Sequence, residues 1–252
     1  MPSSRTALCF VVWNERQGCE FDLPKFDFAG FDEIFAIDGG STDGTIEVLQ
    51  KYGVAVHPQT RRSLCAVYWQ AVETSTCDNI VVFFPKGTLD PSIVHRMREL
   101  LLEGNELVVP SRMIQGSRNE EDSHVFRPRK WGVKTLALIA AASWRKQGPV
   151  VWDVLHGVKG FAKRAFLDME PSRTGVSIDL EMVVRAYRLR LRMREFPVIE
   201  MARSWGASRF KILPTGIRLV KYLCREFRRP GPLRRHSEIS PAEDFLSVVS
   251  DE

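Results

Sequence analysis

The sequence predicts an α/β protein with a mostly parallel central sheet and helices on both faces of that sheet. Two observations lead to this fold class. Over roughly the first hundred residues, short apolar runs that are typical of strands alternate with segments of helical periodicity. These runs are apolar on both sides, as expected for strands buried between two layers of helices. In such sheets, ligands bind at the carboxyl ends of the strands.

The first half of the chain carries this alternation most clearly. Strands are expected at Ala7–Trp13, Glu33–Asp38, Val54–His57, Asn79–Phe84 and Glu106–Ser111. Helices are expected at Thr42–Tyr52, Arg62–Thr74 and Pro91–Glu103. Pro91 suits the first turn of a helix, where its missing N–H would have no partner anyway. Ile93, Met97, Leu100 and Leu101 then give this helix a single apolar stripe.

The second half begins with a loop and then resumes the alternation. Residues 113–132 are polar and charged, and we interpret them as a functional loop rather than a linker between domains. Helices are then expected at Val133–Trp144, Ala162–Met169 and Ser177–Tyr187, and strands at His156–Phe161 and Leu189–Ile199. The alternating arginines of the last strand indicate a charged edge strand or a ligand-binding row. We predict one domain over residues 1–211.

A basic segment follows this domain. Residues 212–235 are expected to form a basic amphipathic helix, and residues 236–252 a flexible polar tail. Ile217, Leu223 and Phe227 share one face of the helix. That face could be buried in an anionic membrane surface, or it could pack against the domain and leave the basic face in solvent. The sequence is compatible with both arrangements.

The composition limits the class of protein. The chain has 252 residues, of which 44% are hydrophobic and 27% charged, as is ordinary for a globular protein. The net charge of +5 favours an anionic partner, but no nucleic acid is expected, because the basic residues are not interleaved with aromatic ones. Five cysteines without CxxC spacing argue against disulfides and structural zinc.

The same features bear on localisation. A cysteine pattern of this kind fits a reducing compartment. Apolar runs in the chain stay far below the ~20 residues that a membrane-spanning helix needs. We therefore expect a cytoplasmic protein, with peripheral attachment to the inner face of the membrane as an option.

Polar residues follow the first two predicted strands. Asn14 and Glu15 come after the first strand, and Asp38 ends the second. If the strands are neighbours, these side chains share one crevice, where carboxylates can accept hydrogen bonds from a ribose or a base. Gly40 lets the backbone approach a ligand closely, and Ser41 stands beside it. The simpler interpretation is a turn without a ligand.

The start of the next helix is predicted from the same stretch. Ser41 or Thr42 is expected to cap the helix through its hydroxyl group, with Asp43 in the first turn. This role is structural, and it is expected whether or not a ligand binds at the crevice.

The motifs "NE" and "DGGSTDGT" resemble the nucleotide-sugar half of family 2 glycosyltransferases, in particular the dolichyl-phosphate or polyprenyl-phosphate sugar transferases. Later segments resemble this family in the same order, over about Ala7 to Lys211. They are "VVPSRMIQGS", "HGVKGFAKRAF", "SIDLEMVVRAYRLRLRMREFPVIE" and "SWGASRFK". The resemblance implies a GT-A nucleotide-diphospho-sugar transferase fold and inverting transfer of a sugar from a nucleotide-diphosphate donor. It also implies a polyprenyl phosphate or similar lipid-phosphate acceptor.

The resemblance assigns roles to individual residues. Asn14, Glu15, Asp38, Gly40 and Ser41 would bind the nucleotide. The acceptor phosphate would lie against Arg112 and Arg118, although arginines of a solvated loop would look the same. Asp179 or Glu181 would act as the general base toward a hydroxyl acceptor, or position the sugar if the acceptor is a phosphate. Two positions apart on a helix, only one of these two acids can point into the site.

Two departures from the family pattern concern its acidic residues. Gly39 replaces the second of two adjacent acids, and "FFPKGTLDP" stands where the family has an Asp-x-Asp for Mg²⁺ or Mn²⁺. Lys86 could neutralise the diphosphate itself. Alternatively, a metal could be held by Asp90, Glu121 and Asp122. A third option is an inactive nucleotide-binding module of the same fold.

Overall fold

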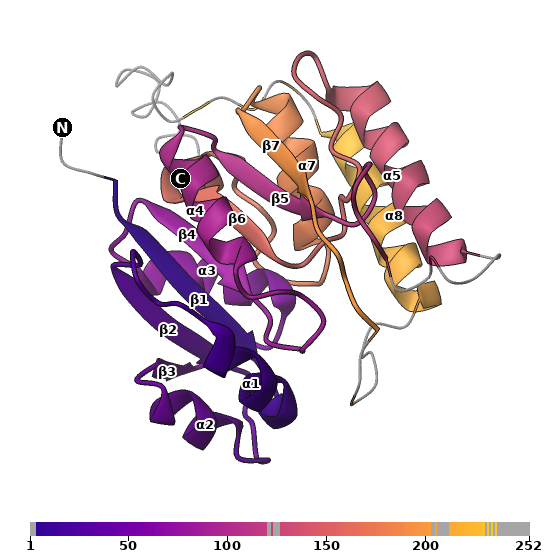
Figure 1. Ribbon diagram of the computed structural model, residues 1–252. Helices are drawn as coiled ribbons and strands as arrows, with labels where there is room; N and C mark the ends of the chain where they lie inside the picture. The colour runs from indigo at the N-terminus through magenta and orange to yellow at the C-terminus, as the bar shows by residue number, and fades with distance from the viewer. Residues whose placement is uncertain are drawn as a thin grey trace, which may run out of the picture.

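A seven-stranded sheet forms the centre of the computed structural model, with the strand order β3-β2-β1-β4-β6-β5-β7 (Figure 1). The strands are β1 (Thr6–Val12), β2 (Glu33–Asp38), β3 (Ala55–Pro58), β4 (Asn79–Phe83), β5 (Leu107–Ser111), β6 (Lys159–Ala162) and β7 (Met193–Pro197). Neighbouring strands are parallel, except that β6 runs antiparallel to both β4 and β5. The structure describes residues 4–119, 122, 127–202, 205, 212–229, 231, 233 and 235.

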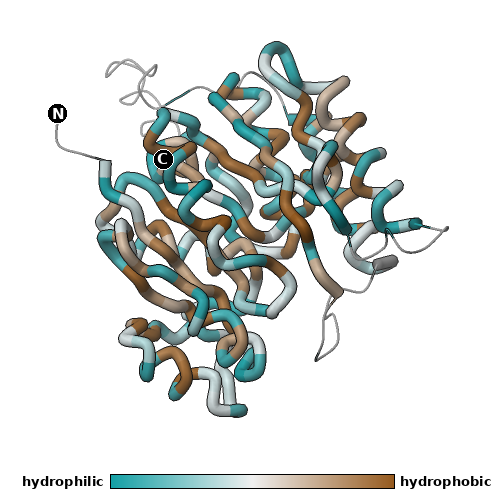
Figure 2. Tube along the Cα trace, in the orientation of Figure 1, coloured by the Kyte–Doolittle hydropathy of each residue, from teal (hydrophilic) through white to brown (hydrophobic). Residues whose placement is uncertain are grey.

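Helices cover both faces of the sheet, as predicted. They are α1 (Arg16–Asp22), the 3-10 turn η1 (Leu23–Lys25), α2 (Thr45–Lys51), α3 (Leu64–Thr74), α4 (Ile93–Leu102), α5 (Pro128–Trp144), α6 (Lys163–Met169), α7 (Ile178–Arg188) and α8 (Ile212–Arg228). One apolar cluster joins the sheet to α3, α5, α6, α7 and α8, and a second joins it to α1, α2 and α4. Hydrophobic residues recur along the central strands, where both clusters meet the sheet (Figure 2).

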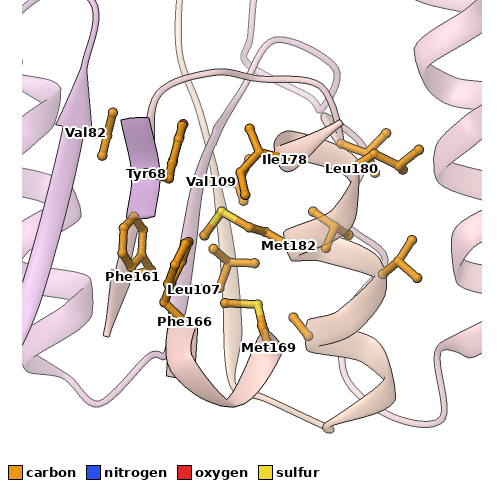
Figure 3. Close-up of a cluster of buried hydrophobic side chains, with 14 of the residues drawn as sticks. Tyr68, Val82, Leu107, Val109, Phe161, Phe166, Met169, Ile178, Leu180 and Met182 are labelled. Atoms are coloured by element: carbon orange, nitrogen blue, oxygen red, sulfur yellow. The ribbon is translucent and has the colours of Figure 1, made fainter. Parts of the chain in front are cut away.

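The alternation of side chains along β1 explains this arrangement. Ala7 and Cys9 point into the first cluster, whereas Leu8 and Phe10 point into the second. Figure 3 shows part of the first cluster, in which Phe161 of β6 lies near Tyr68 of α3. A strand that is apolar on both sides is therefore buried on both sides, which confirms the prediction from the sequence.

The predicted last strand is shorter than expected. β7 begins at Met193 rather than at Leu189, because the chain turns at Arg190, which has a φ of +55°. The strand pairs with β5 and lies at the edge of the sheet, as the charged-edge interpretation expects.

Helix α8 packs against the domain through part of its apolar face. Leu219, Tyr222 and Leu223 are buried in the first cluster, so Leu223 is not available to a membrane. The buried carboxylate of Glu226 accepts a hydrogen bond from Arg188 at 2.5 Å and thereby ties α8 to α7. Among the described residues, no helix combines the length and the apolar character needed to cross a membrane.

Candidate functional site

Hydrogen bonds join the loops that follow β1 and β2. The strands are parallel neighbours, and Val12 is in register with Asp38, so both loops emerge at the same edge of the sheet. The backbone N–H of Asn14 donates to the Ser41 hydroxyl at 2.8 Å, and the Asn14 side-chain oxygen accepts from the N–H of Thr42 at 2.8 Å. The structure thus brings the predicted nucleotide-binding residues together at one edge of the sheet.

Asp38 organises the turn that follows β2. Its carboxylate is 4% exposed and accepts hydrogen bonds from the N–H groups of Gly40 at 3.0 Å and Ser41 at 2.9 Å, and from the Ser41 hydroxyl at 2.5 Å. Gly40 has a φ of +92°, a conformation in which glycine avoids the steric cost of a side chain. Asp38 therefore holds the backbone in shape, and a direct contact with a nucleoside stays a prediction.

The predicted cap of the following helix is wrong. Helix α2 begins at Thr45, its N-cap is Gly44 in the left-handed conformation, and no side chain caps it. The hydroxyl of Ser41 is already engaged with Asp38, so it cannot cap the helix. Asp43 lies before the helix rather than in its first turn, and it accepts hydrogen bonds from the N–H of Arg16 at 3.1 Å and the Thr45 hydroxyl at 2.5 Å.

The surroundings of Gly39 explain why an acid is absent there. A Cβ atom on Gly39 would lie 3.0 Å from Cβ of Trp13 and 3.4 Å from a side-chain oxygen of Gln59, which leaves little room for a carboxylate-bearing side chain. Glu15, on the loop after β1, is half-buried, and its N–H donates to the Thr45 hydroxyl at 2.9 Å. A contact of Glu15 with a ribose or a base stays a prediction.

The loop after β4 is held in place by α1. The N–H of Gly87 donates to the buried carboxylate of Asp22 at 2.8 Å. Gly18 contacts the loop so closely that a Cβ atom there would lie 2.1 Å from the carbonyl oxygen of Pro85. The half-buried Lys86 extends from this fixed backbone, with its Nζ atom 4.8 Å from the centre of the Phe84 ring.

A cavity of about 500 Å³ lies next to this loop. Its polar lining includes Lys86 after β4, Arg112 after β5 and Asp179 near the start of α7. Because β4 and β5 run in the same direction, Lys86 and Arg112 lie at the carboxyl edge of the sheet. The structure therefore brings together three residues that the sequence assigned to catalysis or to the acceptor.

Asp179 faces a buried lysine that sequence reasoning missed. Lys159 of β6 is fully buried, and its Nζ atom lies 3.7 Å from a carboxylate oxygen of Asp179. Burial raises the pKa of Asp179 to about 6, with Lys159 acting in the opposite direction. The signal was present in "HGVKGF", where a lysine interrupts an apolar strand. Asp179 is thus a carboxylate whose protonation changes close to neutral pH.

Arg112 is engaged with two carboxylates. Its Nε and Nη2 atoms donate to the fully buried Asp153 at 2.7 and 2.9 Å, and Nη1 donates to Glu200 at 3.0 Å. Burial alone would raise the pKa of Asp153, but Arg112 outweighs this effect and the pKa is lowered to about 2. The charge of Arg112 is therefore already compensated, so its predicted contact with an acceptor phosphate would have to compete with these two acids.

The remaining candidates on this side of the sheet lie apart from the cavity lining. Glu181 is fully buried and accepts hydrogen bonds from the N–H of Ser172 at 2.7 Å and the hydroxyl of Ser177 at 2.5 Å. Of the two acids on α7, only Asp179 lines the cavity, as the helical spacing predicts. Arg118 is exposed and takes part in a backbone bridge with Ile199. His156, by contrast, is buried and lines the cavity.

The candidate metal ligands do not form a metal site in the part of the chain that the structure describes. Asp90 is exposed and accepts a hydrogen bond from the N–H of Ser92 at 2.9 Å. Asp122 forms ion pairs with Arg127 at 3.0 Å and Lys130 at 2.5 Å, and Glu121 lies outside the described residues. Within the described ranges, no three acidic, histidine or cysteine side chains are grouped to hold a metal ion. These residues do not fit a hard divalent cation, which requires several oxygen ligands.

The strand order, the adjacent loops after β1 and β2 and the cavity after β4 define the class of fold. The chain has the GT-A fold of glycosyltransferases, which confirms both the predicted fold and the resemblance to that class. Glucosyl-3-phosphoglycerate synthase from Mycobacterium tuberculosis, in complex with Mn²⁺ and uridine-diphosphate-glucose, superposes with a TM-score of 0.69. The match has 17% sequence identity and covers 90% of this chain and 80% of the other.

Two archaeal proteins are similar in sequence. Glycosyltransferase AglJ of Haloferax volcanii is 25% identical over 209 residues, which are 80% of this chain and 65% of the relative. This chain thus spans slightly less than two thirds of AglJ. The uncharacterized protein MJ1222 of Methanocaldococcus jannaschii is 24% identical over 223 residues, 84% of this chain and 88% of its own length. No protein-family model matches the sequence.

Proposed function

We propose that the protein is an inverting glycosyltransferase that moves a sugar from a nucleotide-diphosphate donor to a polyprenyl phosphate or a similar acceptor. One observation carries the proposal. Lys86, which stands where the family that the sequence resembles has metal-binding acids, lines the same cavity as Asp179. A cation for the leaving diphosphate and an acid for the acceptor side are thus present at one carboxyl edge of a GT-A sheet.

The proposed reaction needs few groups of the protein. An acceptor oxygen attacks the anomeric carbon, the bond from that carbon to the diphosphate breaks, and the nucleotide diphosphate leaves with the electron pair. The Lys86 ammonium stabilises the negative charge that develops on the leaving phosphate. A phosphate acceptor needs no base, and Asp179 then positions the sugar. With a hydroxyl acceptor, the Asp179 carboxylate accepts the proton.

The observations for and against a bound divalent cation point in opposite directions. The Mycobacterium tuberculosis enzyme was solved with Mn²⁺ together with its donor, which favours a divalent cation in this class of fold. The described residues of this chain do not supply a ligand set for one, and Lys86 occupies the expected place. We therefore propose that Lys86 provides the charge that a metal would provide. A catalytically inactive nucleotide-binding module is the second candidate, because the replaced acids also fit loss of catalysis.

Release of nucleotide from a donor tests the proposed activity. We expect purified protein to release GDP or UDP from at least one nucleotide sugar when a prenyl phosphate is present, with or without added Mg²⁺ or Mn²⁺. Thermal stabilisation by a nucleotide without release from any GDP- or UDP-sugar would favour the inactive module. The absence of both thermal stabilisation and nucleotide release would contradict both candidates.

The pKa of Asp179 gives a prediction about pH. With a hydroxyl acceptor, the charged carboxylate is the active form, so transfer should rise as pH increases through about 6, the pKa to which burial raises this group. Asp179→Asn should lower the rate by about 10²–10³-fold and remove this acidic limb. The pH profile of kcat/KM measures both effects, and Glu181→Gln, outside the cavity lining, is the comparison variant. An unchanged acidic limb in Asp179→Asn would remove Asp179 from the role of base.

A further inference from the structure

Lys159 of β6 is a buried charge that the proposed reaction does not use. The strand lies between β4 and β5, and its lysine is fully buried in register with Val82. The Nζ atom donates a hydrogen bond to the carbonyl oxygen of His156 and lies 3.7 Å from Oδ1 of Asp179. Because a buried ammonium group is costly unless a partner compensates it, a lysine inside a sheet needs a specific explanation.

Lys159 lies behind the wall of the cavity. The described residues that line the cavity include Asp179 and residues 156–158 but not Lys159. The ammonium group nevertheless joins two parts of this wall, since it contacts the carbonyl group of His156 and the carboxylate of Asp179. Any influence of Lys159 on a ligand must therefore pass through these two groups.

The carboxylate of Asp179 depends on this ammonium group. Its Oδ1 atom is buried and makes no hydrogen bond within the part of the chain that the structure describes. A buried carboxylate oxygen of this kind stays charged only where a nearby positive charge compensates it. Lys159 supplies that charge from behind, and the contact fixes the direction of a side chain that lines the cavity.

Four charged side chains act on Asp179. Burial has the largest influence and raises the pKa of its carboxyl group to about 6, whereas Lys159, Arg112 and Lys86 lower the pKa and Asp153 raises it. The effects of Arg112 and Asp153 oppose each other, and these two residues form an ion pair at 2.7 Å. The other two charges are lysines, one in the cavity wall and one behind it.

Helix α3 adds two titratable groups near Asp179, and both are neutral. Burial raises the pKa of the Tyr68 hydroxyl well above its ordinary value and that of the Cys65 thiol to about 12, and Asp179 acts on both in the same direction. Neither group therefore changes its charge in the pH range where Asp179 does.

A bound donor would change the balance between the two lysines. In the proposed reaction Lys86 holds the diphosphate, so the ligand compensates its charge and the negative phosphates favour a protonated Asp179. Lys159 stays behind the cavity wall, and its charge continues to act on Asp179 when the donor is bound.

We propose that Lys159 is a positioning residue that holds Asp179 as a carboxylate directed toward the cavity. The inference rests on the proposed function in one respect, namely that Asp179 acts in its charged form. Lys159 itself contacts neither the sugar nor the acceptor and acts only through Asp179.

The pKa of Asp179 in the free protein tests the inference without any measurement of activity. The full chain is labelled with ¹³C-aspartate, its carboxyl resonances are followed by NMR as pH changes, and the Asp179 resonance is identified by its loss in Asp179→Asn. Lys159→Met should raise this pKa from about 6 to between about 7 and 9, the effect of removing an opposite charge at this distance. An unchanged pKa would overturn the inference.

Lys163→Met is the matched control. Lys163 is the next lysine along the chain, it also donates to a backbone carbonyl group, that of Ser75 at 2.6 Å, and it lies outside the cavity wall. The pKa of Asp179 should keep its wild-type value in this variant, and a rise equal to that in Lys159→Met would contradict a specific pair.

A double variant covers the case in which Lys159→Met does not fold. Lys159→Met, Asp179→Asn should fold, because no charge is then left buried without its partner. Failure of both variants to fold, measured by circular dichroism, would show that the lysine supports packing rather than Asp179, and it would overturn the inference.

The pH profile of transfer separates the inference from the proposed function. With an acceptor that supports transfer, and for a pKa raised by about two, Lys159→Met should be about tenfold slower than the wild type at pH 7. Its rate should approach the wild-type rate near pH 9, whereas an equal loss at every pH would indicate a purely structural role and overturn the inference. A raised pKa in Lys159→Met together with a wild-type protein that transfers no sugar would support the pair and contradict the transferase instead.

Discussion

Replacing Lys86 by alanine will lower the rate of sugar transfer by about 10²–10³-fold, the size of effect seen when one preorganised charge or donor is removed from a leaving group. The charge on the diphosphate grows as the bond to the sugar breaks, so the loss should appear mainly in kcat rather than in KM. Steady-state kinetics with a saturating donor measures the difference. Lys86→Arg keeps the charge and should recover much of the rate.

Two controls define what this result means. Lys51→Ala removes an exposed lysine on α2 and should leave the rate unchanged. Treatment of the wild-type protein with EDTA should also leave the rate unchanged if Lys86 supplies the positive charge. Loss of activity on chelation, or a full rate in Lys86→Ala, would contradict the proposed replacement of a metal by this lysine.

The second large effect concerns stability. Arg112→Met will lower the free energy of unfolding by about 3–5 kcal/mol, because it leaves the carboxylate of Asp153 buried without its partner. Asp153 is fully buried, and it receives three hydrogen bonds from Arg112, at 2.9 Å from the backbone N–H, 2.7 Å from Nε and 2.9 Å from Nη2. Arg118→Met, at an exposed position, should change the free energy by less than about 0.5 kcal/mol. Urea denaturation measures both variants.

The double variant Arg112→Met, Asp153→Asn tests whether the buried charge of Asp153 causes the loss of stability. Removal of both charges should restore part of the lost stability, because no uncompensated charge is then buried. A double variant that is less stable than Arg112→Met alone would indicate that packing of the arginine, rather than its charge, stabilises this region. The comparison of the single and double variants thus separates the contribution of the ion pair to stability from that of the packing of the arginine side chain.

The pH dependence of stability follows from the same pair. The pKa of Asp153 is about 2 in the folded protein against an ordinary value of 3.8, so the pair stabilises the fold fully above about pH 4. This contribution is lost as pH falls from about 4 through 2, where the carboxylate is protonated in the folded state as well. Arg112→Met should therefore lose less stability than the wild type over this interval. A parallel decline of the two proteins would contradict the assignment.

The arrangement of the sheet was largely predictable from residue patterns. Strands such as Glu33–Asp38 contain a continuous apolar run, here residues 34–37, and burial on both faces requires such runs, so the residue pattern and the structure agree for a single strand. The antiparallel insertion of β6 between β4 and β5 was not predictable in this way. Strand order depends on contacts between distant segments, such as Val81 with Gly160, and periodicity carries no information about them.

The positions of the loops at the site were predictable from the sequence, but the ion-pair partners of its charged residues were not. The adjacency of "NE" and "DGG" could be predicted because parallel neighbouring strands place the loops that follow them at one edge of the sheet. The partners of Arg112 and Asp179 come from segments dozens of residues away, Asp153 and Lys159, and only the fold brings them together. The predicted helix cap was wrong because the Ser41 hydroxyl can bond either to the start of the helix or to Asp38. In the structure it donates to Asp38 and accepts from the N–H of Asn14.

Close contacts around the loop after β4 limit which side chains its positions can accommodate. Gly87 has a φ of +66°, and a Cβ atom there would lie 2.5 Å from the ring of Trp205, so an acid at this position would displace both the backbone and the tryptophan. The contact between Gly18 and Pro85 fixes the other side of the loop. Position 86 lies between these two tight contacts, and its side chain is half-buried. An acidic pair in this loop would therefore require changes in α1 and around Trp205 as well, whereas Lys86 can be exchanged without moving either contact.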